Sequence, residues 1–437
     1  MEKLFTDFES VSYDQWLKKI EQDLKGKSMD LLHKQPEADL ETKAYYHPEE
    51  GSYSNIAGNF NPDPNWKIRQ QYTGNDSNDY LLSTLNDGVN HLGLELNDQT
   101  SFNEQTKGVM FEHISADIAF TDPETAKAFT SDVTTDLSFD VIKLNQKVGK
   151  WNYSLVDFID FYRSQPNHNT VWVNGSAYGN AGATSIQELA FTLAHLNEYL
   201  HALKENEEDI SKAFSKIIIQ LSCSGNFVVS IAKFRAIREL IKLVATAYEI
   251  GDINPIKLYG TTGRRQLCQN DHNNNLLRQT TQCAAAAIGG CDVITVDVLN
   301  KSDANAKRLA KNIQLVLKEE SFLNKVSDPS GGAYAIERMT DQLIEKAWKL
   351  FQRIESEEGL IEWIKNDKVH QLISENRRVL IEQLNENKET LLGVNKYRSN
   401  LEEWKETNET SFAEGMDFTP MTDFILEEQY EPKTVTE

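Results

Sequence analysis

The chain has 437 residues, which is longer than one ordinary hydrophobic core and suits either a large single domain with additions or two domains. It carries 45 lysines and arginines against 67 aspartates and glutamates, a formal net charge of −22. Because no basic stripe offsets this charge, we expect the chain to bind neither nucleic acid nor an anionic membrane surface.

The cysteines and the apolar segments bear on the cellular compartment. None of the four cysteines, Cys223, Cys268, Cys283 and Cys291, forms a CxxC pair, so we do not expect a structural zinc site. The N-terminus lacks the apolar core of a signal peptide, and no stretch approaches the roughly 18 apolar residues of a membrane span. We therefore expect a soluble, cytoplasmic protein with reduced thiols.

The first element in the chain is a predicted helix in an N-terminal arm. Asp14 can cap it, and Trp16, Ile20 and Leu24 recur at positions i, i+4 and i+8. This spacing gives the helix one apolar face that requires a partner surface. The face could dock on the chain's own fold or on another subunit, and the sequence leaves both open.

From residue 65 onwards, short extended segments alternate with helices. The extended candidates are residues 66–72, 91–96, 109–113, 141–144 and 169–176. The helical candidates between them are residues 78–90, 122–132 and 155–164, followed by three helices at 185–200, 210–221 and 228–248. Alternation of this kind is typical of an α/β fold with a parallel sheet.

Residues 256–300 form the most informative stretch. A strand at 256–259 leads into a polar loop at 260–274, an alanine-rich helix at 275–288 and a second strand at 293–298. In a parallel barrel, a loop that leaves the carboxyl end of a strand lies on the face that carries the chemistry. Further helices are expected at 305–317, 334–355 and 370–385.

The predicted fold is therefore α/β, a (β/α)8 TIM barrel with an N-terminal helical arm, a C-terminal helical extension and an extended tail. We expect four parts, namely a subunit-docking arm at 1–50, the barrel at 51–365, the helical extension at 366–400 and an acidic tail or linker at 401–437. The tail lacks sustained periodicity, so it is either disordered or an extended strap over a partner.

Three polar groups are weak candidates for chemistry. His195, Glu198 and His201 share a helix, but carboxylate-bridged metal sites need a second Glu-x-x-His pair, which the sequence lacks. Asp271-His272, with the arginines of the same loop, could supply acid–base and anion-binding groups. The Gly331-Gly332 turn precedes a helix but has no phosphate-loop spacing.

Specific motifs then resemble the methylmalonyl-CoA mutase family. They are the NDHNNN loop at 270–275 with the alanine run at 284–287 and Gly289-Gly290, the DPSGGAYAIE run at 328–337, and the GVNKY run at 393–397. The resemblance covers nearly the whole chain. It implies a barrel along whose axis acyl-CoA threads, with adenosylcobalamin over its C-terminal face on a separate domain.

This sequence departs from the family pattern after the predicted strand near residue 171. Ser176 stands where the family has a tyrosine, Ala177 where it has the catalytic histidine, and Asn180 where it has a glutamate. A methyl group cannot donate a hydrogen bond to a thioester carbonyl. The resemblance therefore leaves the chain without a catalytic residue at the histidine position.

A second set of departures lies after the two later strands. Tyr259 and Thr261 replace the family's histidine and glutamine, and Arg264 and Arg265 replace its glycine and tryptophan. Lys301 is the middle residue of a triplet that replaces the family's D-E-A, which faces the corrin. We interpret all of these as degenerate pocket positions, with the two arginines as plugs or interface residues.

These departures point to the small, non-catalytic subunit of a heterodimeric member of the family. No Asp-x-His-x-x-Gly motif occurs, so we expect this chain to bind no cofactor and no metal, and adenosylcobalamin to lie on a large catalytic partner subunit. The isolated chain could form a homodimer. A barrel that no longer admits CoA is expected to fill its axis with side chains.

Two other interpretations remain open. The chain could be an active acyl-CoA mutase barrel that works with a separate cobalamin-binding polypeptide, with Tyr178 or Tyr259 replacing the histidine. It could also be a repurposed binding module whose ligand lies at Arg264 and Arg265.

Overall fold

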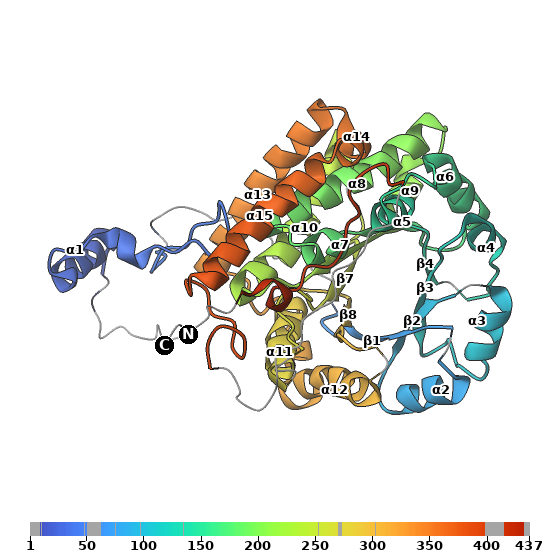
Figure 1. Ribbon diagram of the computed structural model, residues 1–437, viewed down its shortest axis with the longest axis horizontal. Helices are drawn as coiled ribbons and strands as arrows, with labels where there is room; N and C mark the ends of the chain where they lie inside the picture. Colours follow the sequence, from blue (N-terminus) through green and yellow to red (C-terminus); the bar gives the residue numbers. More distant parts are fainter. Residues whose placement is uncertain are drawn as a thin grey trace.

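A computed structural model describes residues 9, 11–47, 49, 63–74, 76–96, 98–133, 135–251, 253–269, 273–301, 303–397 and 415–431. Within these ranges, eight parallel strands surround one axis and helices pack on their outer side (Figure 1). The predicted (β/α)8 barrel is confirmed. The loop residues Asp271 and His272 lie outside the described ranges.

The strands are β1 (Lys67–Tyr72), β2 (His91–Glu95), β3 (Ser115–Ala119), β4 (Asp136–Ser138), β5 (Val171–Asn174), β6 (Ile217–Ser222), β7 (Lys257–Thr261) and β8 (Val293–Thr295). The sheet order is β4-β3-β2-β1-β8-β7-β6-β5. A single parallel bridge between Asp136 and Asn169 joins the two outer strands. The barrel is therefore nearly closed, so side chains at alternate strand positions point into one shared axis.

The helices of the first half are α1 (Tyr13–Leu24), η1 (Met29–Leu32), α2 (Asn78–Asn86), α3 (Gln99–Gln105), α4 (Pro123–Ala128), α5 (Val141–Val148), α6 (Leu155–Ser164), α7 (Ser176–Asn180), α8 (Ser185–Glu205) and α9 (Ile210–Phe214). Those of the second half are α10 (Phe227–Ala247), α11 (Asn273–Ile288), α12 (Ala304–Leu315), η3 (Val316–Glu320), η4 (Leu323–Lys325), α13 (Tyr334–Ser356), α14 (Gly359–Lys365), α15 (Lys368–Asn385) and η5 (Glu427–Gln429). None of the helices in the described ranges is both long and apolar enough to cross a lipid bilayer.

Two short segments do not have the predicted extended structure. Residues 141–144 are the first turn of α5, because the Asp140 carboxylate accepts a hydrogen bond from the Lys143 backbone nitrogen at 3.0 Å and caps the helix. Residues 109–113 lie in turns, and the strand begins later, at Ser115. The prediction missed β3 because its buried face includes an aspartate.

The predicted helix at 210–221 is also wrong. It divides into the short helix α9 and the strand β6, whose run of three isoleucines at 217–219 has the β-branched side chains that favour strands. The three-residue strand β4 and the helix α14 were not predicted. Both are short, and an aspartate opens β4.

Helices α8, α10 and α13 pack together beside the barrel (Figure 1), and α8 packs against β5. Arg235 is fully buried between them and holds Asp328 at 2.5 Å and Glu337 at 2.6 Å. This buried arginine fixes the turn before α13 onto α10. A buried charge with two carboxylate partners stabilises only this one arrangement of the elements.

The N-terminal helix α1 projects away from the barrel (Figure 1), and none of its residues is buried. Its Trp16 ring stacks on Tyr45 at 4.4 Å, within the arm itself. The arm is attached further along, where Glu37 accepts hydrogen bonds from the Ser185 backbone and hydroxyl. The structure therefore does not support docking of α1 on its own barrel.

Residues 415–431, which we call the strap, lie across the carboxyl ends of several barrel strands. Figure 1 shows the strap in red as it passes α5 and α7 towards α11. Backbone nitrogens donate along its length, from Met421 to Gln146, from Phe424 to Asn180, and from Leu426 to Arg265. The tail was predicted to be either disordered or an extended strap over a partner. Its described part is an extended strap, but it covers the barrel of its own chain.

Candidate functional site

A cavity of about 600 Å³ lies at the carboxyl ends of the strands, inside the barrel. All eight strands contribute to its wall, and residues 421–423 of the strap close one side. In barrels of this class, this face carries ligand and catalytic sites. The cavity is therefore the candidate functional site.

Six of the eight sequence-predicted positions line this cavity, namely Ser176, Ala177, Asn180, Thr261, Arg264 and Lys301. The first three belong to α7, a short helix that follows directly after β5. This close turn requires Gly175, since an added Cβ would lie 2.1 Å from the hydroxyl oxygen of Thr192.

Tyr259 is not part of the cavity wall but belongs to a hydrogen-bonded network below it, which we call the axial network. Its members are Arg69, His91, Asp117, Asp136, Lys257 and Tyr259. They come from five strands, namely the neighbours β1 to β4 and the more distant β7.

The upper half of the axial network is an arginine–carboxylate fork. Arg69 Nε lies 2.5 Å from one Asp117 oxygen and Nη2 lies 2.7 Å from the other. Gly93 makes room for it, because a Cβ there would lie 2.2 Å from the guanidinium. Burial favours the neutral acid, but Arg69 and His91 outweigh this and lower the pKa of Asp117 to about 2.

The lower half of the axial network is centred on Asp136. It accepts a hydrogen bond from the Tyr259 hydroxyl at 2.6 Å and pairs with Lys257 at 2.7 Å. The Trp172 ring packs 4.7 Å from the Tyr259 ring. Burial lowers the pKa of His91, which lies against this group, so its imidazole is neutral at neutral pH.

We expected side chains to fill the barrel axis. This is correct below the cavity and wrong at the C-terminal end of the barrel. The axial network and Trp172, only 4 % exposed, fill the axis below the cavity. Above them the axis stays open, because residues such as Ala177 and Thr261 are too small to close the space. A ligand reaching this cavity must enter from the C-terminal face.

The Arg264 side chain links the barrel to the strap. Its Nη1 lies 2.5 Å from the Asp423 carboxylate, and its Nε lies 3.5 Å from Asp297. Its backbone nitrogen donates to the Asn180 side chain at 3.1 Å. Both carboxylates line the cavity. They neutralise the Arg264 guanidinium, which is therefore not free to bind an anionic ligand.

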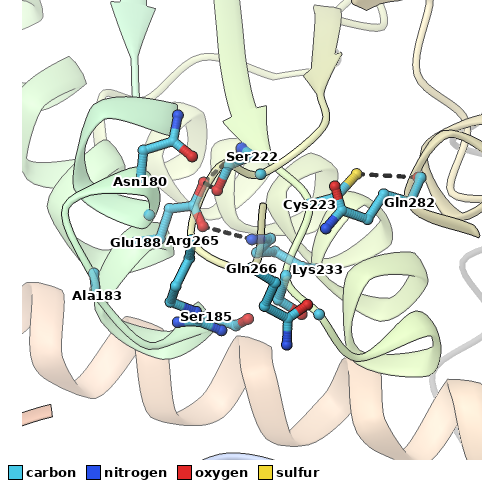
Figure 2. Close-up of a pocket in the computed structure, with 14 residues that line it drawn as sticks. Asn180, Ala183, Ser185, Glu188, Ser222, Cys223, Lys233, Arg265, Gln266 and Gln282 are labelled. Carbon is cyan, nitrogen blue, oxygen red and sulfur yellow. Dashed lines mark hydrogen bonds and ion pairs between the residues drawn. The ribbon is translucent and has the colours of Figure 1, made fainter. Parts of the chain in front are cut away.

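Arg265 faces a different and much smaller pocket, with room for about one water molecule (Figure 2). Figure 2 shows Glu188 directed towards Lys233, and their charged atoms lie 2.5 Å apart. Burial raises the pKa of the neighbouring Cys223 thiol to about 12, so it is not a nucleophile at neutral pH. We interpret this pocket as a buried ion pair that ties α8 to α10.

The histidines and glutamate of α8 do not converge on a common point. His195 Nε2 lies 3.0 Å from Asp140, whereas Glu198 accepts a hydrogen bond from the Ile361 backbone nitrogen. His201 is exposed and lies beside Glu205. In the part of the chain that the structure describes, no group of three or more histidine, cysteine, aspartate or glutamate side chains could hold a metal ion.

Comparison with known proteins then decides the family. The family profile described as Methylmalonyl-CoA mutase matches residues 149–415, which is more than half of the chain. The chain belongs to the methylmalonyl-CoA mutase family. The match includes β5 to β8 and all eight of the sequence-predicted pocket positions.

Several similar relatives carry the name methylmalonyl-CoA mutase small subunit. The protein of Porphyromonas gingivalis is 29 % identical over 91 % of this chain and 71 % of its own length. That of Streptomyces virginiae is 28 % identical over 76 % of this chain, which spans 58 % of that relative. A Rhizobium meliloti protein named methylmalonyl-CoA mutase is 29 % identical over 56 % of this chain and 35 % of its own length.

Sequence reasoning missed three features of this site. Lys143 and Lys147 line the cavity, but residues 141–144, which include Lys143, were predicted as a strand, so the place of these lysines on α5 was not foreseen. The fork between Arg69 and Asp117 joins residues 48 positions apart. The strap contacts the site from beyond residue 414, and only its acidic, aperiodic composition gave a signal.

Proposed function

We propose that this chain is the small subunit of an adenosylcobalamin-dependent methylmalonyl-CoA mutase, which interconverts methylmalonyl-CoA and succinyl-CoA. In this proposal the chain is a non-catalytic partner in a heterodimer with a large subunit that binds cobalamin and substrate. The names of its relatives support the subunit assignment. A cytoplasmic location is part of the same proposal.

The observation that carries the proposal is the blocked axis. The family resemblance implies that acyl-CoA threads along the barrel axis, whereas here Arg69, Asp117 and Tyr259 form hydrogen bonds across it. To admit a pantetheine chain, the protein would have to separate a buried ion pair, which is costly unless both charges find new partners. We therefore infer that this barrel does not bind acyl-CoA in the manner of a catalytic subunit.

Two features on the C-terminal face support the same conclusion. Ala177 offers only a methyl group to the cavity, so it cannot orient or protonate a thioester. The strap covers the carboxyl ends of β5 to β7, where residues 424 and 426 bond to Asn180 and Arg265. The strap therefore covers part of the surface on which the resemblance implies that cobalamin would lie.

The N-terminal arm is the proposed docking element. None of the α1 residues is buried among the described residues, and Trp16 of α1 forms an aromatic surface with Tyr45. We propose the division into the arm at 1–50, the barrel at 51–365, the helical extension at 366–400 and the tail at 401–437 as the working description of the chain.

The alternative of an active barrel with a separate cobalamin-binding polypeptide requires a replacement proton donor. Both candidate tyrosines are buried and outside the cavity wall. The Tyr178 hydroxyl lies 3.1 Å from His195, and the Tyr259 hydroxyl is bonded to Asp136. Arg264, the centre of the binding-module alternative, is neutralised by two carboxylates. The structural-partner proposal is therefore preferred.

Co-expression with a large subunit tests the proposal. We expect the two chains to co-purify as a 1:1 complex with mutase activity, and this chain alone to show no cobalamin absorbance and no turnover. Deleting residues 1–27 should abolish co-purification without unfolding the barrel, which circular dichroism can check. Turnover by the isolated chain with added cobalamin would contradict the proposal.

A further inference from the structure

The charged side chains of the cavity wall balance one another. Five cationic and five acidic residues line the cavity, so its wall has no net formal charge. Arg69 holds Asp117, while Arg264 holds Asp423 and lies 3.5 Å from Asp297. An ionic ligand would lose its hydration in this cavity and gain little net attraction from the wall. The uncharged side chains are therefore the groups that can select a ligand.

The uncharged polar side chains gather on the wall formed by β4, β5, β6 and α7. Asn174 on β5 and Gln220 on β6 are register partners, and both line the cavity. Ser176 follows on α7, and Ser138 lines the cavity from β4. Asn174 and Ser176 are only 8 % and 4 % exposed. Amide and hydroxyl groups buried to this extent require hydrogen-bond partners.

Three of these side chains form a directed chain of hydrogen bonds. The Ser176 hydroxyl donates to the Asn174 amide oxygen at 2.7 Å, and the Asn174 amide nitrogen donates to the Gln220 amide oxygen at 3.4 Å. The backbone nitrogen of Asn174 donates to the Asp140 carboxylate at 3.0 Å, which fixes the end of β5. The chain ends at the Gln220 amide nitrogen, for which the described residues supply no acceptor. This nitrogen is therefore a donor that the cavity holds ready for an acceptor atom.

The surface next to this donor wall is apolar. Trp172 lies two positions before Asn174 on β5, so the two side chains share one face of the strand. Trp172 lines the cavity, and its ring is held 4.7 Å from the Tyr259 ring. Ala177 and Met421 add further apolar surface. Apolar surface with a few fixed polar groups is the usual composition of a small-molecule site.

The cavity has room for a ligand and reaches solvent. Its volume of about 600 Å³ is within the range of sites for small molecules. Glu95, at the end of β2, and Lys301, after β8, line the cavity and are exposed. The strap therefore does not seal the cavity.

We propose that Asn174, Ser176 and Gln220, beside Trp172, form a binding site for a small uncharged compound rich in hydroxyl groups, namely a monosaccharide or a cyclic polyol. Such a compound offers hydroxyl oxygens to the Gln220 amide nitrogen and C–H groups to the apolar surface. The inference goes beyond the proposed function, because it gives the chain a ligand site of its own. It does not depend on whether the chain pairs with a catalytic subunit.

Ligand-observed NMR titration of the full chain tests the proposal. Glucose and myo-inositol are the probes, and glucuronate is the matched charged compound, because it keeps the sugar ring and adds a carboxylate. We expect saturable binding of at least one of the two neutral probes. Glucuronate should bind at least about tenfold more weakly than glucose, since a wall without net charge does not offset the desolvation of a carboxylate.

Variants of the wall locate the site. Gln220→Leu keeps the size of the side chain and removes the donor, so it should weaken binding by about fivefold or more, as loss of one neutral hydrogen bond implies. Ser176→Ala leaves the Asn174 amide without its donor and should weaken binding by about twofold or more. Gln352→Leu is the matched control, because Gln352 is an exposed glutamine of α13 outside the cavity wall. Its affinity should equal that of the native chain.

Should Gln220→Leu fail to fold, the comparison of Ser176→Ala with Gln352→Leu still decides the question. The proposal is overturned if neither neutral probe binds saturably, if glucuronate binds as tightly as glucose, or if the wall variants bind like the control.

Discussion

The guanidinium of Arg69 is the only cation within 4 Å of Asp117 in the described chain, and the neutral ring of His91 adds a hydrogen bond. Asp117 is 2 % exposed, so its charge depends on these neighbours rather than on water. Its pKa of about 2 lies below the ordinary value, so the ion pair stabilises the fold at all pH values above the unfolded pKa and is lost only in strong acid.

We expect Arg69→Met to lower the free energy of unfolding by about 3–5 kcal/mol, because it leaves a buried carboxylate without its partner. The double variant Arg69→Met/Asp117→Leu removes both charges and should recover more than about half of that loss. Urea denaturation followed by circular dichroism measures all three free energies. A single variant that costs less than about 1 kcal/mol would mean that water reaches Asp117 and that the axis is not closed.

At the level of elements, the strap depends on one residue of α15. Arg377 donates to the backbone carbonyls of Ala181 and Thr422, and its guanidinium lies 5.2 Å from the Phe424 ring centroid. It therefore binds both the barrel and the strap. Its neighbour Arg378 is exposed and, within the described ranges, pairs with Glu382 alone, four residues further along α15.

This pair of arginines gives a matched test of the strap. We expect Arg377→Ala to raise amide hydrogen exchange in residues 415–431 by at least about tenfold, since the strap loses one hydrogen bond and a ring contact that tie it to the barrel. Arg378→Ala should leave that exchange unchanged. Mass spectrometry of peptic peptides measures both. Equal protection in the two variants would show that Phe424 and the backbone hydrogen bonds hold the strap without Arg377.

The junction of α8, α13 and α14 contains two carboxylates, Glu198 and Glu355. Burial raises the pKa of Glu355 to about 7, and nearby Glu198 adds to this, while a hydrogen bond from Asn197 opposes it. Between the ordinary value of 4.5 and about 7, the folded chain therefore keeps a proton that the unfolded chain has released. Stability from this group is present below that window and is lost as the pH rises through it.

Glu355→Gln cannot ionise, so we expect its free energy of unfolding to decline less than that of the native chain between pH 5 and about 7.5. Glu345→Gln, on an exposed position of the same helix, should follow the native slope. Urea midpoints at four pH values compare the three proteins. A native slope retained in Glu355→Gln would assign the decline to other groups.

The sequence predicted the elements with regular patterns and missed those whose patterns are broken. The alanine-rich helix α11, stopped by Gly289-Gly290, begins within two residues of its predicted position. The strands β3 and β4 were missed because Asp117 and Asp136 interrupt their apolar character. Those aspartates are tolerated only because Arg69 and Lys257 reach them from other strands, and no local pattern reveals such long-range pairs.

The candidate site shows the same limit. Six cavity positions followed from family motifs at the ends of β5, β7 and β8, where a barrel places its functional side chains. The axial network did not, because its residues come from five different strands. Whether a degenerate pocket is filled or empty is set by the packing of those distant side chains.

For the whole molecule, the central claim is that this barrel does not turn over acyl-CoA and that any activity of a complex arises in the large subunit. The blocked axis, the methyl group of Ala177 and the strap over the C-terminal face each support it. These three features involve residues on different strands and in the tail. A single substitution would therefore not restore a catalytic barrel.

The most direct test is a mutase assay of a complex in which only the large subunit has been inactivated, at the histidine that the family resemblance assigns to its active site. The native complex provides the reference rate, and this chain is left unchanged in both. The account predicts that succinyl-CoA formation falls to the background of the cofactor alone. Turnover that persists in the inactivated complex and disappears when Ala177→Trp closes the cavity of this chain would contradict it.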